Sequence, residues 1–377
     1  MSVLNVIAQH YIPITMAVCL AHSAAPGFSL MFMEMIAKNK YRMKRILVLV
    51  CLMALMIPMP AGNKHKDDRP VVASYVTGWN ADMPLPDCSV LTHINYAFGN
   101  VNKTYDGVII QRPDRLRQLA ALKKDHQIYV ILSIGGWTAG GFSEMASTDK
   151  RRKAFAKDCK RIVKEYGLDG IDIDWEYPSC DEAGISASPD DIDNFTLLMK
   201  ELRKALGKSY LLSCATIADA KFVDFKAIEP YVDLVNIMMY DVGNPPYHHA
   251  SLYRSEKSGH VTAQEAFQAH LNAGIPAHKL VLGVPFYGRS VKGFGDTAYG
   301  ALVKRTDVTR VWDDVAKAPY LVQDGEFVCT YEDAESLAWK CRFIKETGMR
   351  GAMYWEYRCD DEAGTLRNAV WHGVMDQ

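Results

Sequence analysis

Short apolar runs alternate with amphipathic segments from Val71 to the end of the chain, and this alternation constrains the fold more than any other feature. Continuous apolar strands are typical of a parallel sheet that is covered on both faces. Eight such strands with helices between them favour an α/β fold, a closed (β/α)8 TIM barrel, over an open doubly wound sheet. The predicted strands are residues 71–76, 91–98, 128–134, 170–175, 211–216, 232–239, 280–285 and 351–355. The predicted helices, from the spacing of apolar residues, are 113–124, 150–166, 190–206, 222–228, 262–273 and 331–347.

The composition excludes several classes of function. The 377 residues carry 43 Lys and Arg against 44 Asp and Glu, and this balance predicts no nucleic-acid partner. No glycine-rich phosphate loop follows the first predicted strand, which argues against a dinucleotide-binding fold. The nine cysteines are scattered, and no pair has the spacing of zinc ligands. We expect no cofactor and no metal site, and we expect a monomer.

Acidic residues occupy every second position along the fourth predicted strand, at Asp172, Asp174 and Glu176. Residues two apart in a strand face the same side, so the three acids point one way and the apolar residues between them point the other. In a barrel the apolar set would pack under the helices. The acids would then lie on the inside of the barrel.

Carboxyl groups in this pattern indicate acid–base chemistry. Neighbouring acids on one strand face are about 6–7 Å apart at Cα, so in a confined space at least one keeps its proton to higher pH. A retained proton is what a general acid needs, and Glu176 lies nearest the carboxyl end of the strand, where barrel active sites occur. A solvated acidic edge or a magnesium or calcium site is the alternative. The interleaved apolar residues argue against the edge, and a second acidic cluster at residues 360–362 is more simply a charged turn.

The segment from Asp169 to Glu176 resembles the D-G-x-D-x-D-x-E signature of glycoside hydrolase family 18, the chitinase family, at every motif position. Other motifs of that family follow the family's order, and the resemblance extends from Val71 to the C-terminus. They are Ser133-Ile134-Gly135-Gly136 followed by Trp137, Met238-Met239-Tyr240-Asp241, Tyr287-Gly288-Arg289 and Trp355, with Tyr75, Trp79 and Phe98 on the first two strands.

The resemblance implies a retaining mechanism in which the 2-acetamido group of the sugar attacks its own anomeric carbon. Glu176 is then the general acid and base, Asp174 orients the acetamido group, Asp172 modulates the proton of Asp174, and Tyr240 donates a hydrogen bond to the acetamido group. Trp355 is the expected floor for a sugar ring. Further substrate contacts are assigned to Tyr75, Phe98, Trp79, Trp137, Met238, Asp241, Tyr287 and Arg289. Structural roles are assigned to Asp169, which precedes the strand out of phase with the other acids, and to Ser133, Gly135 and Gly136.

The function expected from this resemblance is cleavage of β-1,4-linked N-acetylglucosamine polymers, with chitin or its oligosaccharides as the partner. One alternative within the family is an endo-β-N-acetylglucosaminidase that acts on N-glycans. Another alternative, of a different class, is a catalytically inactive chitin-binding lectin on the same barrel. Such lectins usually lose the acid, whereas Glu176 is present here.

The N-terminal segment has the layout of an export signal. A basic start at Met43-Lys44-Arg45 precedes an apolar run at residues 46–59 and a small-residue exit at residues 60–62. We therefore expect a signal peptide at residues 43–62, a spurious extension at residues 1–42 and a catalytic barrel at residues 70–377. The expected location is secreted or periplasmic, without a stable membrane span after processing. A membrane anchor formed by the N-terminal segment is the alternative.

The connection between the seventh and eighth strands is far longer than the usual 2–6 residues. We expect a small β-rich insertion at about residues 290–330 that forms one wall of the substrate groove. Its end, residues 319–330, predicts a hairpin, because Asp324-Gly325 is a favoured two-residue turn between strands.

Overall fold

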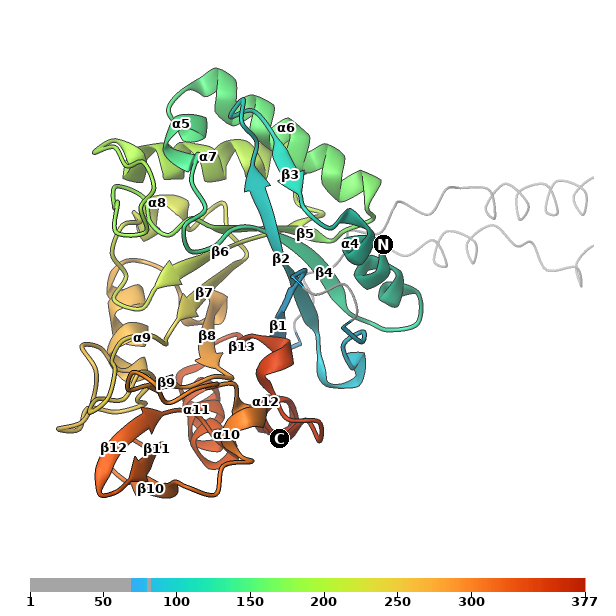
Figure 1. Cartoon of the computed structure of the whole chain (residues 1–377). Coiled ribbons are helices and arrows are strands. Elements are labelled where there is room, and N and C mark those ends of the chain that lie inside the picture. The colour runs from blue at the N-terminus through green and yellow to red at the C-terminus, as the bar shows by residue number, and fades with distance from the viewer. Residues whose placement is uncertain (1–68, 80–82, 377) are drawn as a thin grey trace, which may run out of the picture. The chain divides into compact units, whose positions relative to one another are not determined.

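The computed structural model describes residues 69–79 and 83–376. Within these residues, parallel strands close into an eight-stranded barrel, because the last strand, β13, pairs with the first, β1, which also pairs with β2 (Figure 1). The predicted (β/α)8 barrel is confirmed. The barrel strands are β1 (Val71–Thr77), β2 (His93–Val101), β4 (Tyr129–Gly135), β5 (Gly170–Asp174), β6 (Leu211–Ile217), β7 (Leu234–Met238), β8 (Leu280–Pro285) and β13 (Gly351–Trp355). A short strand, β3 (Val108–Ile110), extends the sheet antiparallel to β2.

Helices cover the outside of the barrel, and side chains near their first turns fix where several of them begin. The Thr148 hydroxyl accepts from the Arg151 amide at the start of α6, and Thr262 with Glu265 forms a capping box at the start of α9. The helices are α4 (Pro113–Ala121), α5 (Phe142–Ala146), α6 (Asp149–Glu165), α7 (Asp191–Leu206), α8 (Phe225–Ile228), α9 (Ala263–Asn272), α10 (Tyr299–Leu302), α11 (Ala334–Thr347) and α12 (Thr365–Met375). Single 3-10 turns are η1 (Cys88–Val90), η2 (Leu122–Lys124), η3 (Ala277–Lys279) and η4 (Tyr357–Cys359).

The alternation along β5 separates two apolar cores. Ile171, Ile173 and Trp175 belong to the large core between the strands and the helices. There the Trp175 ring stacks on Phe142, with 5.3 Å between ring centroids. A smaller core inside the barrel contains Tyr75 from β1 and other inward residues. The acids of β5 therefore point into the barrel, as their two-residue spacing predicts.

The segment between β8 and β13 contains a small antiparallel sheet, as the sequence predicts. Its strands are β9 (Arg289–Ser290), β10 (Thr309–Asp313), β11 (Ala318–Gln323) and β12 (Glu326–Thr330), in the order β10-β11-β12-β9. β11 and β12 form the predicted hairpin, and both Asp324 and Gly325 have the positive φ that such a turn requires. This sheet packs on the loop after β7, where the His248 ring contacts the rings of Tyr320 and Phe327, which stack on each other.

The predictions for residues 1–62 lie outside the described residues. In the part of the chain that the structure describes, no helix is both long enough and apolar enough to cross a membrane. The seven cysteines in that part are all free thiols.

The acidic cluster at residues 360–362 lies just before α12, and the Asp360 carboxylate accepts from the amides of Leu366 and Arg367 in the first turn of that helix. It is the charged turn that the sequence predicts.

Candidate active site

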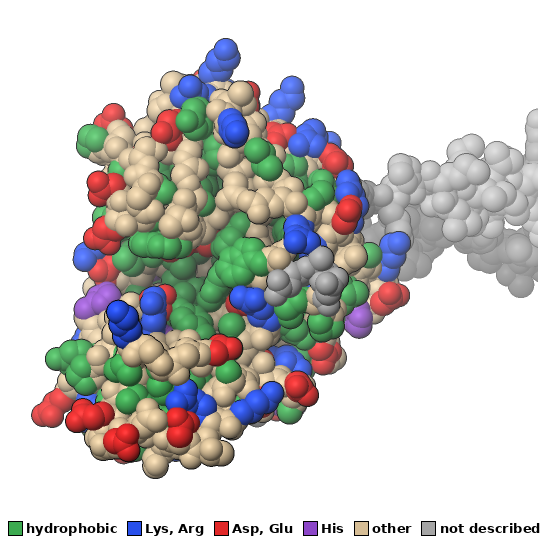
Figure 2. Space-filling model, viewed as in Figure 1, with side chains coloured by type: hydrophobic (Ala, Val, Ile, Leu, Met, Phe, Trp, Pro, Cys, Tyr) green, Lys and Arg blue, Asp and Glu red, His purple; other side chains and the backbone are tan. Residues whose placement is uncertain are grey.

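A cavity of about 970 Å³ lies at the carboxyl ends of the barrel strands. Figure 2 shows the corresponding hollow, with hydrophobic side chains inside it and basic side chains at its edges. Most of the predicted site residues line this cavity: Tyr75, Trp79, Phe98, Gly135, Gly136, Trp137, Asp174, Glu176, Met238, Tyr240, Asp241, Tyr287, Arg289 and Trp355. The described lining does not include Asp172, Ser133 or Asp169.

Asp172 is fully buried in the barrel and its carboxylate accepts four hydrogen bonds from four other strands. Oδ2 accepts from the hydroxyls of Tyr75 and Ser133, both at 2.8 Å. Oδ1 accepts from the Ser213 hydroxyl at 2.6 Å and from Asn236 Nδ2 at 3.2 Å. Burial raises the pKa of Asp172 above its ordinary value, and these hydrogen bonds lower the pKa without cancelling that effect. Asp172 is thereby held in one orientation behind Asp174.

Asp174 ends β5 and lines the cavity, although its side chain is almost completely buried. Its Oδ1 atom has no hydrogen-bond partner among the described residues. Burial raises the pKa of Asp174 well above its ordinary value, and the neighbouring carboxyls of Glu176 and Asp172 raise it further. A buried carboxyl oxygen without a partner is costly, so this atom is available for a polar group of a ligand.

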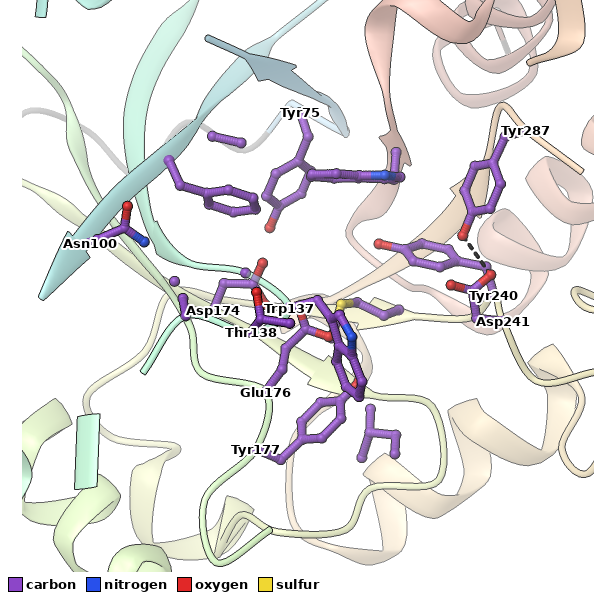
Figure 3. A pocket seen from close by; sticks show the side chains of 18 of the residues that line it. Tyr75, Asn100, Trp137, Thr138, Asp174, Glu176, Tyr177, Tyr240, Asp241 and Tyr287 are labelled. Atoms are coloured by element: carbon purple, nitrogen blue, oxygen red, sulfur yellow. Dashed lines mark hydrogen bonds between the residues drawn. The ribbon is translucent and has the colours of Figure 1, made fainter. Parts of the chain in front are cut away.

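Glu176 lies two residues beyond Asp174, after the end of β5, and points into the cavity beside Trp137 and Tyr177 (Figure 3). Burial raises the pKa of Glu176 to about 7, the negative charge of Asp241 also raises it, and Tyr177 acts in the opposite direction. A carboxyl with this pKa still carries its proton in a large share of molecules near neutral pH. Glu176 can therefore act as a proton donor and, once ionised, as a proton acceptor.

The pKa of Glu176 predicts the alkaline limb of the activity profile. Because the protonated form donates the proton, kcat/KM should fall tenfold for each pH unit once the pH rises well above about 7. Initial rates on a soluble oligosaccharide, measured from about pH 5 to about pH 9, check this expectation. A limb near the ordinary glutamate value of 4.5 would show that burial does not tune this group in the free enzyme.

Asp241 and its partners form the opposite side of the cavity (Figure 3). Asp241 Oδ1 accepts from the Tyr287 hydroxyl at 2.7 Å and from Arg289 Nε at 2.6 Å, and His249 Nδ1 lies 3.6 Å away. Burial alone would raise the pKa of Asp241, but the interactions with His249, Arg289 and Tyr287 outweigh burial and lower it. Asp241 is thus a fixed negative charge. The adjacent Tyr240 has a pKa raised by burial, so its hydroxyl remains a donor.

Aromatic side chains cluster around Trp355 at the end of β13. The Trp355 ring lies 5.6 Å from the rings of Phe98 and Tyr75, measured between centroids, and is nearly parallel to Phe98. Trp79 and Trp137 are 53% and 54% exposed, whereas the core Trp175 is 2% exposed. Exposed indole faces at a cavity are suited to the C–H faces of a sugar ring. The sequence leaves plain packing open for Trp79 and Trp137, and their exposure argues against it.

Two glycines let the backbone of β4 approach the acids closely. A Cβ on Gly135 would overlap the carbonyl oxygen of Asp174, and a Cβ on Gly136 would lie 2.6 Å from the Phe98 ring. Both glycines have positive φ, at 128° and 94°.

Asp169 lies just before β5, where its carboxylate accepts from the Val130 amide at 2.9 Å. It is at the amino end of the strand, away from the cavity.

Several residues that contribute to the site are absent from the sequence-based assignment. Ser213 and Asn236 hold Asp172, and both are inward-facing polar residues on β6 and β7. A polar residue at an inward position of an apolar strand is a signal that could have found them. Another lining residue, Asn100, lies near the end of β2. The rest come from loops after strands, where no periodicity guides prediction: Gln111, Arg112, Thr138, Tyr177, Glu182 and His260.

The structure corrects the prediction that the insertion between β8 and β13 forms a wall of the substrate groove. Arg289 lines the cavity from β9, but no described residue from 290 to 330 does so. The rest of the insertion packs on the loop after β7 and on α11, for example through Arg310, which bonds to Asp333 and Glu335. The prediction that the insertion at about residues 290–330 forms a wall of the cavity that contains Glu176 is therefore wrong.

Within the described residues, no group of three or more His, Cys, Asp or Glu side chains is arranged to hold a metal ion. The site instead combines a proton-donating carboxyl, a second buried carboxyl two residues before it, and an aromatic floor. On the carboxyl-end face of a (β/α)8 barrel, these features define a glycoside hydrolase.

Comparison with known proteins agrees with this class. Residues 71–360 match the model of the family described as glycosyl hydrolases family 18, and the chain belongs to that family. It is 30% identical to chitinase A1 of Niallia circulans, over 87% of this chain and 62% of that protein, and 30% identical to chitinase 1 of Aphanocladium album, over 81% of this chain and 86% of that protein. Among solved structures, a family 18 N-acetylglucosaminidase from Paenibacillus barengoltzii is 36% identical, with a TM-score of 0.74, over 81% of this chain and all of that one.

Proposed function

We propose that the protein hydrolyses chitin and its oligosaccharides, polymers of β-1,4-linked N-acetylglucosamine, with retention of anomeric configuration. The observation that carries the proposal is the combination of Glu176, whose pKa is about 7, with a buried Asp174 oxygen that has no hydrogen-bond partner among the described residues. The named relatives are chitinases, which supports this substrate class. The chain spans 62% of the length of one of them, so their other activities are not carried over.

In the proposed mechanism, the acetamido carbonyl oxygen attacks C1 of its own sugar as the bond from C1 to the leaving oxygen breaks. Glu176 gives its proton to that leaving oxygen. Asp174 accepts a hydrogen bond from the acetamido N–H and stabilises the oxazolinium ion that forms. Water then attacks C1 from the face that the leaving group vacated, the bond from C1 to the acetamido oxygen breaks, and ionised Glu176 takes the proton from water. Two inversions at C1 give net retention.

Tyr240 and Trp355 position the reacting sugar in this scheme. The Tyr240 hydroxyl, which stays protonated, donates to the acetamido oxygen, and the ring of Trp355 supports the sugar from below. Asp172 orients Asp174 from within the barrel. Burial is the main cause of the raised pKa of Glu176, and the negative charge of Asp241 adds to it.

A second candidate is the release of single N-acetylglucosamine units from chain ends. It is favoured by the likeness to the Paenibacillus barengoltzii structure, which is described as an N-acetylglucosaminidase. Digestion of chitin oligosaccharides of two to six sugars, beside a high-mannose glycopeptide and with products identified by mass spectrometry, separates these functions. We expect cleavage of the oligosaccharides at internal bonds. Monosaccharide as the sole early product would favour the second candidate, and cleavage of the glycopeptide alone would overturn both.

We also propose that the protein is exported by a signal peptide that starts at Met43. The proposal is supported by the basic start, the apolar run and the small-residue exit at residues 43–62. N-terminal sequencing of the mature protein from its native host tests it. A mature chain that retains residues 1–42 would contradict it.

A further inference from the structure

Glu356 is a buried carboxyl group that the proposed mechanism does not use. It directly follows Trp355, is 2% exposed, and is not among the described residues that line the cavity. A buried carboxylate is costly unless it is paired and hydrogen-bonded. Its two oxygens are bonded separately: Oε2 accepts from the Thr77 hydroxyl at 3.1 Å, and Oε1 accepts from Arg358 Nε.

Glu356 Oε1 also accepts from the Cys359 thiol at 3.9 Å, and the other two partners, Thr77 and Arg358, connect Glu356 to Trp79. Thr77 is the last residue of β1 and precedes Trp79 by two positions. The guanidinium carbon of Arg358 lies over the Trp79 ring, 5.4 Å from its centroid, as in a cation–π contact. The Trp79 ring also meets Trp355 edge-on, with 6.2 Å between centroids. Trp79 is 53% exposed among the described residues, so much of its indole lies outside the packed interior.

We propose that Glu356 and Arg358 are positioning residues for Trp79. The Glu356 carboxylate fixes the Arg358 guanidinium, and the guanidinium holds the indole of Trp79 in one plane at the rim of the cavity. The two residues therefore determine how well the rim binds sugars that extend beyond Trp355. This role rests on the proposed function, because an ordered indole at the rim matters for a chain of sugars.

Charge and burial support this assignment. Burial raises the pKa of Glu356 above its ordinary value, and the positive charge of Arg358 opposes that rise. The ionised form of the Glu356 carboxyl is thus stabilised by the charge of Arg358. The Arg358 side chain is 37% exposed, so its replacement removes little packing from the barrel core.

The experiment is a double-mutant cycle with Arg358→Met, Trp79→Ala and the combination of both. On the hexasaccharide of N-acetylglucosamine, Arg358→Met should raise KM by about two- to fivefold, the range expected for an exposed cation–π contact, with kcat unchanged. On a disaccharide substrate KM should change much less. In the Trp79→Ala background the Arg358 change should have no further effect. An equal effect with and without Trp79 would overturn the proposal.

A second measurement does not depend on catalysis. In protein labelled with 5-fluorotryptophan, the fluorine resonance of Trp79, identified by its loss in Trp79→Phe, should shift in Arg358→Met and in Glu356→Gln. Arg117→Met is the matched control, because Arg117 lies 4.7 Å over the Tyr166 ring on the outer helices. It should leave both KM and the Trp79 resonance unchanged.

These readouts separate the two hypotheses. If the wild-type protein cleaves no oligosaccharide, the proposed function fails, and the fluorine resonance still decides whether Arg358 positions Trp79. If Arg358→Met unfolds because Glu356 loses its cation, Glu356→Gln with Arg358→Met removes both charges and serves in its place. An unchanged Trp79 resonance in a folded variant would overturn the positioning role.

Discussion

Replacement of Glu176 by Gln should lower kcat on chitin oligosaccharides by at least about 10²–10⁴, the usual contribution of a general acid. Gln has nearly the shape of Glu but has no proton of suitable acidity, so the leaving oxygen would depart unprotonated. Binding of oligosaccharides should persist, because Trp355 and the other aromatic residues remain. Initial rates and binding calorimetry measure the two effects. Glu346→Gln, an exposed change on α11, is the control. A Glu176→Gln variant that keeps more than about a tenth of wild-type activity would show that Glu176 is not the acid.

The same variant should be at least as stable as the wild type. Burial raises the pKa of Glu176 from 4.5 to about 7, so the folded state binds this proton more tightly than the unfolded state does. In the wild type, the group therefore lowers the stability as the pH rises from about 4.5 to about 7. Gln removes that loss, and the gain in melting temperature should be larger at about pH 8 than at about pH 5. A lower melting temperature at both values would show that the carboxylate has a structural role.

Fully deacetylated chitosan oligosaccharides should not be cleaved at a measurable rate, whereas acetylated ones of the same length should be. The reason is that the carboxyl groups nearest Glu176 on β5 cannot replace the acetamido oxygen as nucleophile. Asp172 is buried with four hydrogen bonds and does not line the cavity, and Asp174 orients the acetamido group in the proposed mechanism. Asp241 lines the cavity, but its carboxylate is held by Tyr287 and Arg289.

Proton NMR of the early products on acetylated oligosaccharides provides the companion measurement. The β-anomer should appear first, because the mechanism retains configuration. An α-anomer at early times would mean direct attack by water. Cleavage of the deacetylated chain would mean that a carboxylate of the protein is the nucleophile. Either result would contradict substrate assistance.

The sequence by itself determined the barrel and the position of the candidate acid, Glu176, on it. Hydrophobic periodicity is local, so the alternation of apolar strands with amphipathic helices is visible without a partner strand. The same two-residue period separates Asp172, Asp174 and Glu176 from Ile171, Ile173 and Trp175. The structure places the two sets inside the barrel and under the helices as expected. The hairpin at Asp324-Gly325 is equally local, because the turn depends on the backbone freedom of two residues.

Only the tertiary structure decided which residues surround the acids of the site and how these neighbours shift the pKa values of the acids. The four donors to Asp172 come from four other strands. The Arg289 side chain, which donates to the Asp241 carboxylate, lies almost 50 positions from it in the sequence. The tertiary structure also decided the exposure of Trp79 and Trp137 and placed the insertion at about residues 290–330 away from the cavity. These features depend on strand register, barrel closure and loop paths. Such long-range contacts leave no periodic trace in the sequence, whereas the faces of a single strand do.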